Sequence, residues 1–299
     1  MKSFIYDKYG YYVDDDTTKF DYKDWHFELE LTKYNESELL NMKTFLKEIP
    51  IYFSNLESDI VFSRDNKLLQ ESIYGNVCLV ATKKKKISID ELISFPLLFS
   101  FMAENKSLKI SQIKQVWINK VDKIEEKILT KVKIDDFTYK LLMELYIFNA
   151  GLAETAIQYL ADTIYLYGDN VEEISLAHKR IKDFSSYTFL NPLNFIVDFK
   201  YRDISELIKN DLISFDELKN KIIKLNLSSK NASLILARLL YPTDLYDVLE
   251  EFYLIKKDVS KEIYLLHNNI NKKIEKIKKV YNLFINLYKI KPINWLDTI

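Results

Sequence analysis

The spacing of apolar residues changes along the chain, from a period of two to a period between three and four. Residues Trp25–Leu31 alternate apolar and polar side chains, which predicts a strand. Short alternating runs over residues 50–88, with a turn at Tyr74–Asn76, predict an antiparallel meander. Residues 35–46 place apolar side chains at helical spacing behind a capping residue, which predicts one helix. The first third of the chain is therefore expected to be rich in β structure.

From about residue 90 the pattern becomes helical. Apolar residues recur every three or four positions, and proline interrupts the pattern because it cannot donate to the helical hydrogen-bond ladder. The predicted helices cover residues 90–104 with an interruption at Pro96, 111–129, 137–163, 205–209, 234–253 with a break at Tyr241–Pro242, and 263–288.

Gly151 falls inside the apolar pattern of the helix at 137–163. A glycine in a helix interior costs about 1 kcal/mol relative to alanine. We therefore expect either a break in this helix or a neighbouring element packed against the bare backbone.

The composition suits one large folded chain. Its 299 residues are 48% hydrophobic and 14% aromatic, and this length fits a two-lobed single fold. The net charge of −1 gives no overall field that would attract nucleic acid, so no nucleic-acid partner is expected. The single cysteine, Cys78, excludes an internal disulfide framework and suits a reducing compartment. No signal peptide and no membrane-spanning apolar run is visible, so cytoplasmic synthesis is expected.

Three charged runs favour solvated surfaces over binding sites. Asp14–Asp16 lacks the spacing of a calcium loop and is interpreted as a turn. Lys83–Lys86 is interpreted as a loop between a strand and a helix, with an acidic partner or a phosphate as the alternative. The lysines between residues 272 and 279 are interpreted as the solvent-exposed face of a helix that packs on the protein by its apolar face. The alternative is a helix that binds acidic lipid.

Asp198 is the residue most strongly placed for chemistry. Phe195–Val197 is a short apolar run that follows the turn-forming Asn191–Pro192, so it predicts a buried strand that ends at Asp198. A carboxylate at the end of a buried strand needs a cation, a metal ion or several hydrogen-bond donors.

Four stretches in order carry a resemblance to a known family. His178–Arg180 lies 20 residues before Asp198 and resembles the catalytic segment of kinase-fold phosphotransferases of the aminoglycoside phosphotransferase type. Three further stretches restrict the resemblance to one group of such proteins, namely Gly151–Thr163, Tyr201–Lys209 and Leu236–Pro242. Together they resemble the spore-coat-associated kinase-like proteins of the YutH and CotS group in endospore-forming bacteria. The similarity covers about residues 1–255 and is strongest from residue 140 onward.

The resemblance implies an α+β, protein-kinase-like fold with two lobes. Residues 1–88 would form a small N-terminal antiparallel β lobe, and residues 89–299 a larger helical C-terminal lobe with the catalytic-like segment at 176–203. In the family a His-x-Asp motif supplies the catalytic base, an asparagine five residues later helps to hold the metal, and an aspartate at a strand end binds Mg²⁺. Asp198 matches that metal-binding aspartate, and Asp203 matches a bracing residue, with Arg202 as its neighbouring cation.

The catalytic-like segment departs from the family pattern at both remaining positions. Arg180 stands where the base aspartate belongs, and Ser185 stands where the metal-holding asparagine belongs. His178 alone is kept from the His-x-Asp motif, and Asp183 is the candidate for a substitute base.

The expected nucleotide-binding positions depart from the pattern as well. Glu30 takes the place of the strand lysine that pairs with phosphate, so it cannot form an ion pair with Glu38 of the next helix. Lys33 is a candidate substitute, although it lies on the wrong side of a strict alternation. The chain has only four glycines, at positions 10, 75, 151 and 168, so a glycine-rich phosphate loop is missing from the sequence.

These departures favour a catalytically degenerate kinase-fold protein that needs no cofactor and acts by binding protein partners, with spore coat components and spore coat association implied by the resemblance. The first alternative is an active ATP-dependent phosphotransferase of the aminoglycoside or choline kinase-like class, with Asp198 holding Mg²⁺ and Asp183 or Asp203 as the base. The second is a nucleotide sensor that binds without transfer. The third alternative, which is compatible with the favoured interpretation, is a buried cluster of paired charges in which Arg180 neutralises Asp198 or Asp203.

Overall fold

The chain divides into two compact units in the computed structural model, which describes residues 2–14, 17–103, 106–129, 136–255 and 258–298. Unit 1 comprises Met1–Glu104 and Ser175–Asp203, and unit 2 comprises Asn105–Ile174 and Ile204–Ile299. Part of the predicted turn at Asp14–Asp16 lies outside the described residues.

Unit 1 is built around an antiparallel sheet with the strand order β1-β2-β5-β3, in which β4 also pairs with β5. The strands are β1 (Lys19–Tyr22), β2 (Trp25–Leu31), β3 (Ser58–Val61), β4 (Gln70–Ser72) and β5 (Gly75–Lys83). Strand β5 is the longest and pairs with β2 from Trp25 opposite Lys83 to Leu31 opposite Val77.

The alternation of β2 separates an apolar face from a polar one. Phe27 and Leu29 are buried with Val77 and Leu79 of β5 against helix α1 (Lys2–Tyr9), where they form one core cluster. The residues between them on β2 point to the opposite face of the sheet, which is the face that carries the polar site described below.

The rest of unit 1 consists of short helices and a second, two-stranded sheet of β6 and β7. These elements are α2 (Glu36–Leu46), α3 (Ile49–Tyr52), α4 (Ile89–Leu98), the 3₁₀ helix η1 (Ser100–Ala103), β6 (Ile174–His178), α7 (Ser186–Leu190), the 3₁₀ helix η2 (Pro192–Asn194) and β7 (Phe195–Phe199). The capping box of Asn35 and Glu38 starts α2, and that of Ser88 and Glu91 starts α4. Helix α7 packs against β5.

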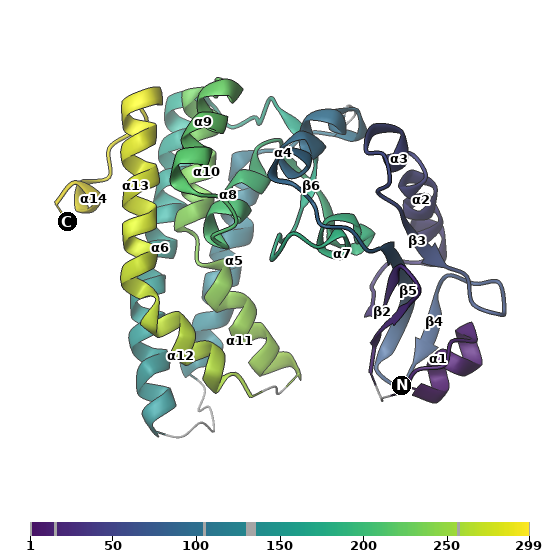
Figure 1. Cartoon of the computed structure of the whole chain (residues 1–299). Coiled ribbons are helices and arrows are strands. Elements are labelled where there is room, and N and C mark those ends of the chain that lie inside the picture. The colour runs from purple at the N-terminus through teal and green to yellow at the C-terminus, as the bar shows by residue number, and fades with distance from the viewer. Residues whose placement is uncertain (1, 15–16, 104–105, 130–135, 256–257, 299) are drawn as a thin grey trace. The chain divides into compact units, whose positions relative to one another are not determined.

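Unit 2 is helical. Its helices are α5 (Ile110–Leu129), α6 (Asp136–Tyr167), α9 (Phe215–Leu225), α10 (Ser229–Leu240), α11 (Thr243–Ile255), α12 (Ser260–Asn268), α13 (Ile270–Tyr288) and α14 (Asn294–Thr298), and α8 (Arg202–Lys209) leads into it from unit 1. Helix α10 packs against both α6 and α13, and nearly all of its residues are buried (Figure 1). No helix within the described ranges is long and apolar enough to cross a membrane.

Most predicted elements are confirmed. The strand at Trp25–Leu31, the helix capped at Asn35, the strand that contains Phe195–Val197 and the helix break at Tyr241–Pro242 all lie where the pattern predicted them. The predicted lobe boundary after residue 88 stays a prediction. The two compact units are groups of residues in dense mutual contact, and they are not defined by the two lobes of the kinase fold.

Three predictions about helices were wrong. Helix α4 continues through Pro96 and ends at Leu98, so the expected interruption at Pro96 is not present. The helix predicted at 263–288 is interrupted at Asn269, whose side-chain amide donates to the Leu265 carbonyl at 2.8 Å and so competes with the helical ladder. Helix α6 runs through Gly151 without a break, and a Cβ added there would meet no atom within 4 Å, so no neighbour packs on the bare backbone.

Candidate functional site: a polar cavity in unit 1

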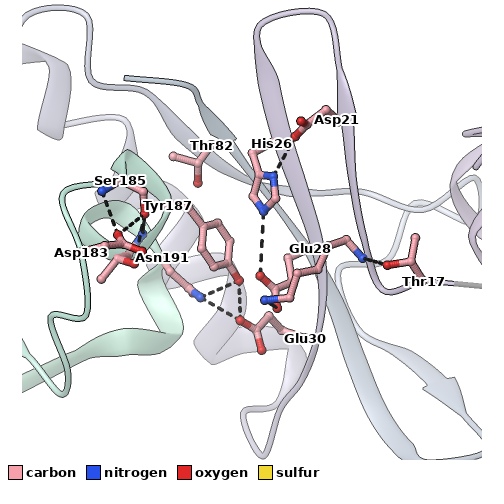
Figure 2. Close-up of polar contacts among 12 residues, drawn as sticks. Thr17, Asp21, His26, Glu28, Glu30, Thr82, Asp183, Ser185, Tyr187 and Asn191 are labelled. Carbon is pink, nitrogen blue, oxygen red and sulfur yellow. Dashed lines mark hydrogen bonds and ion pairs between the residues drawn. The ribbon is translucent and has the colours of Figure 1, made fainter. Parts of the chain in front are cut away.

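The polar face of the sheet borders an open cavity of about 860 Å³. One wall comes from β1 and β2, and the facing wall comes from the segment between Arg180 and Asn194, which includes α7. Charged and polar side chains from both walls face one another across this space (Figure 2). All of the lining residues belong to unit 1.

Glu30 joins the two walls of the cavity. The Tyr187 hydroxyl and the Asn191 side-chain amide both donate to Oε1 of Glu30, the amide at 2.9 Å. Asn191 also donates to the Tyr187 hydroxyl oxygen at 2.9 Å, which closes a triangle of three side chains (Figure 2). Burial, with Glu30 and Glu28 beside it, raises the pKa of the Tyr187 hydroxyl far above its ordinary value, so Tyr187 stays a donor.

Glu28 lies two residues before Glu30 on β2, and its side chain is on the same face of the strand. Its Oε1 accepts from the Lys19 ammonium at 2.6 Å, and its Oε2 lies 4.0 Å from Nε2 of His26. The other ring nitrogen of His26 contacts Asp21 at 2.8 Å. Glu28, and Asp21 with it, raises the pKa of His26 above its ordinary value although partial burial opposes this.

The segment after β5 is tied to the start of α7 through the backbone. The Ser186 hydroxyl donates to the Lys83 carbonyl at 2.6 Å and accepts from the Lys85 N–H at 3.0 Å. The Ser186 N–H donates to the Lys85 carbonyl at 2.9 Å, and the Ile87 N–H donates to the Phe184 carbonyl at 2.8 Å. These main-chain groups along the border of the cavity are therefore already bonded to the chain itself.

The lysine run at 83–86 forms the expected loop between a strand and a helix, except that its first residue ends β5. Lys83 lies in β5 and pairs with Glu57 at 2.7 Å, Lys84 pairs with Asp21 at 2.8 Å, and Lys85 pairs with Glu91 at 3.0 Å. Three of the four lysines thus have carboxylate partners, and two of them border the cavity.

Three residues of the catalytic-like segment line the cavity together: Arg180, Asp183 and Ser185. Oδ1 of Asp183 accepts from the N–H of Ser185 at 2.8 Å and from its hydroxyl at 2.5 Å. Burial alone would raise the pKa of Asp183, but these bonds outweigh it and hold the pKa below the ordinary value. Arg180 donates from its guanidinium to the Lys179 carbonyl at 2.7 Å.

His178 is buried in an aromatic cluster. Its ring lies 4.8 Å from that of Phe95, 5.1 Å from that of Phe189 and 5.5 Å from that of Phe195. Nε2 of His178 contacts the Phe189 carbonyl at 2.8 Å and donates to it, and Nδ1 contacts Oδ2 of Asp203 at 2.6 Å. The His178 N–H also donates to Oδ1 of Asp203 at 2.9 Å, so Asp203 ties the end of β6 to the start of α8.

Asp198 is buried and ion-paired. Its Oδ2 lies 2.5 Å from a guanidinium nitrogen of Arg202, and its Oδ1 accepts from the Phe199 N–H at 2.7 Å. Arg202, expected beside Asp203, thus pairs with Asp198, and it also donates to the carbonyls of His178 and Lys179. The predicted role of Arg180 in neutralising Asp198 or Asp203 stays a prediction.

This arrangement does not suit Mg²⁺. A divalent cation needs several oxygen ligands, and Asp198 is held by a cation on one oxygen and by an N–H on the other. Among the described residues no group of three or more histidine, cysteine, aspartate or glutamate side chains could hold a metal ion. Asp198 is also not among the residues that line the cavity.

The other two predicted nucleotide-binding residues lie elsewhere in unit 1. Lys33 is exposed beyond the end of β2. Glu38 accepts from the N–H of Asn35 at 2.8 Å and so caps its own helix. The sequence interpretation missed Glu28, Tyr187 and Asn191. The two-residue spacing of Glu28 and Glu30 on a predicted strand was the available signal, because it places both side chains on one face.

The comparisons with known proteins bear on this site. The family model described as "Spore coat putative kinase YutH" matches residues 2–286. The chain belongs to this family. The endospore coat-associated protein YutH of Bacillus subtilis (strain 168) is 25% identical over 162 residues, which make up 49% of this chain and 48% of that protein. The chain thus spans about half the length of the curated relative that it matches.

The fold of the YutH-family chain resembles that of aminoglycoside phosphotransferases. The crystal structure of one from Alicyclobacillus acidocaldarius matches with a TM-score of 0.55 and 11% identity, over 90% of this chain and 92% of that one. A spectinomycin phosphotransferase, crystallised with ADP and spectinomycin, matches with a TM-score of 0.57 and 10% identity, over 94% and 97%. At this identity the likeness shows the fold alone, and it confirms the predicted α+β, kinase-like fold.

Proposed function

We propose that this protein is a catalytically inactive member of the kinase fold that acts by binding other proteins, in assembly of the spore coat. The coat setting comes from the family description and from the name of the Bacillus subtilis relative. The inactivity is inferred from the site.

The observation that carries the proposal is the ion pair of Asp198 with Arg202. In the kinase fold the strand-end aspartate must be free to hold Mg²⁺ beside the phosphates. Here the same carboxylate is buried, 5% exposed, and already neutralised by a guanidinium at 2.5 Å. Moving Arg202 away would remove a charge partner from a buried carboxylate, which is unfavourable.

Two further features support the same conclusion. Glu30 places a negative charge on β2 where the fold needs a cation for the phosphates, and its hydrogen bonds to Tyr187 and Asn191 fix it there. At the border of the cavity the Lys83 carbonyl and the Lys85 N–H are both hydrogen-bonded to the Ser186 hydroxyl, so this N–H is not open to a nucleotide.

An active phosphotransferase with Asp183 as its base is the second candidate, because Asp183 lines the cavity. Its lowered pKa makes it a weak proton acceptor, since a general base works best with a pKa near the operating pH. Asp203 is buried against His178 and is the weaker candidate for a base.

The test is phosphate release and transfer with γ-labelled ATP and Mg²⁺, alongside an active aminoglycoside phosphotransferase under the same conditions. We expect no turnover above that of buffer. Turnover that disappears in Asp198→Asn, with the fold retained, would overturn the proposal and establish the phosphotransferase.

A further inference from the structure

One oxygen of Glu30, in the wall of the cavity, has no partner. The Tyr187 and Asn191 donors both bind Oε1, and within the described chain Oε2 makes no hydrogen bond. Both donors are neutral groups, and no lysine, arginine or histidine nitrogen of the described residues pairs with Glu30. Its negative charge is therefore uncompensated by this part of the protein.

Glu28 adds a second incompletely paired carboxylate to the same corner. The residue is only 8% exposed, and its Oε2 is buried without a hydrogen-bond partner among the described residues. Lys19 pairs with Oε1 at 2.6 Å, and Nε2 of His26 lies 4.0 Å from Oε2. A buried carboxylate oxygen without a donor is costly, and a positive charge nearby lowers that cost.

The strand geometry brings the two charges together. Residues two apart on a strand point to the same face and lie roughly 7 Å apart along it. Glu28 and Glu30 therefore lie side by side on the β2 wall of the cavity, Glu28 with cation partners and Glu30 without one among the described residues, and we call this pair of carboxylates the acidic corner. Beside Glu30 a phosphate group would be repelled, and a cation would be attracted.

Lys19 and His26 pair with Glu28, and the other cations that line the cavity lie beside groups outside the acidic corner. Lys84 pairs with Asp21, and Lys85 pairs with Glu91. Arg180 donates to the Lys179 carbonyl, and Lys182 lies beside Asp183, whose pKa it helps to lower. The facing wall, as far as the structure describes it, thus supplies no cation that pairs with the acidic corner.

We propose that the acidic corner binds an organic cation, an ammonium or a guanidinium group, with Oε2 of Glu30 as its direct acceptor and Glu28 as a second negative charge. A hydrogen bond between a charged donor and a carboxylate is stronger than one between neutral groups, which fits an acceptor left open beside two neutral donors. The proposal rests on the proposed function, because it assigns to the cavity a ligand other than a nucleotide.

The first experiment compares two probes on the full chain by calorimetric titration. One probe is Nα-acetyl-lysine methylamide, which carries the free ε-ammonium, and the other is the same molecule with that amine acetylated. We expect the charged probe to bind at least about tenfold more tightly than the neutral one. Equal binding of the two, or no binding of either, would overturn the proposal. This comparison needs no variant, so it does not depend on how a mutant folds.

The second experiment places the probe in the cavity. Glu30→Gln keeps the size and one acceptor oxygen but removes the charge, and it should weaken binding of the charged probe by about tenfold or more. Glu71→Gln, at an exposed position of β4, is the matched control and should leave binding unchanged. Unchanged binding in Glu30→Gln, with the thermal midpoint retained, would contradict the assignment.

Two sources of the cation can be separated with n-butylammonium and with a short peptide that contains one lysine. Butylammonium as tight as the lysine probe would identify a free amine as the ligand. A peptide at least about tenfold tighter, a difference of about 1.4 kcal/mol, would identify a lysine side chain of a partner protein. Failure of the amine titrations leaves the phosphate-transfer assay unaffected, so the two proposals can fail separately.

Discussion

Buried and exposed carboxylates of this protein differ sharply in what their removal should cost. Asp203 is 1% exposed, accepts from the main-chain N–H of His178 and is hydrogen-bonded to its ring. Asp65 is exposed and pairs with Lys8 at 3.2 Å. The contrast tests whether Asp203 braces the fold.

We expect Asp203→Ala to lower the free energy of unfolding by about 3–5 kcal/mol, because it leaves His178 buried without its partner. Asp65→Ala should cost less than about 1 kcal/mol, since an exposed ion pair contributes little. Urea unfolding of both variants measures the difference. A loss in Asp203→Ala no larger than that in Asp65→Ala would show that the contact does not brace the chain.

His26 makes stability depend on pH. Its pKa is raised in the folded protein by Glu28 and Asp21, so the folded state binds the proton more tightly than the unfolded state does. The stabilising contribution is therefore complete below the ordinary value of about 6.5 and is lost as the pH rises through the raised folded value.

The stability of the wild type relative to His26→Gln should accordingly decline as the pH rises through this window. An NMR titration of the His26 ring gives the folded pKa directly, and Glu28→Gln should move it downward. A measured pKa at or below the ordinary value in the wild type is the result that this interpretation does not allow.

At the scale of single elements, helix α6 offers a test with a built-in control. Gly151 lies inside the helix, is exposed, and has no atom within 4 Å of the position that an alanine methyl group would occupy. Gly168 follows the end of the same helix with equal space but a φ of +83°. The two glycines therefore differ in backbone conformation but not in the space available for a Cβ atom.

Gly151→Ala should raise the free energy of unfolding by about 1 kcal/mol, because alanine is the better helix former. Gly168→Ala should lower it by about 1 kcal/mol, because a Cβ is unfavourable at positive φ. Thermal unfolding of the two variants gives the signs. A destabilised Gly151→Ala would contradict the assignment of this glycine to an unstrained, uncrowded helix position.

The elements were predictable to the extent that their signals are local. The alternation at Trp25–Leu31 and the proline at 242 each decide a structure within a few residues, and both predictions are confirmed. The interruption at Asn269 depends on a single side chain that bonds back to its own helix, and periodicity does not detect that competition.

At the scale of the whole molecule, the resemblance predicted the fold but not the content of the cavity. Glu30 and Tyr187 are 157 residues apart, and no spacing rule joins positions at that separation. The resemblance predicts changed family positions at 30, 180 and 185, and this assignment stays a prediction. Which carboxylate pairs with which cation depends on side-chain directions, so the pairing of Arg202 with Asp198 appeared only in the structure.

The central claim is that this kinase fold no longer uses Mg²⁺ and ATP. Thermal unfolding of the full chain with and without ATP and Mg²⁺ tests it most directly, because a ligand at a hundredfold excess over its dissociation constant stabilises the native state by about 2.7 kcal/mol. We predict no shift in the melting temperature. A rise that requires Mg²⁺ and disappears in Asp198→Asn would contradict the account, since it would mean that Asp198 leaves Arg202 to hold a metal.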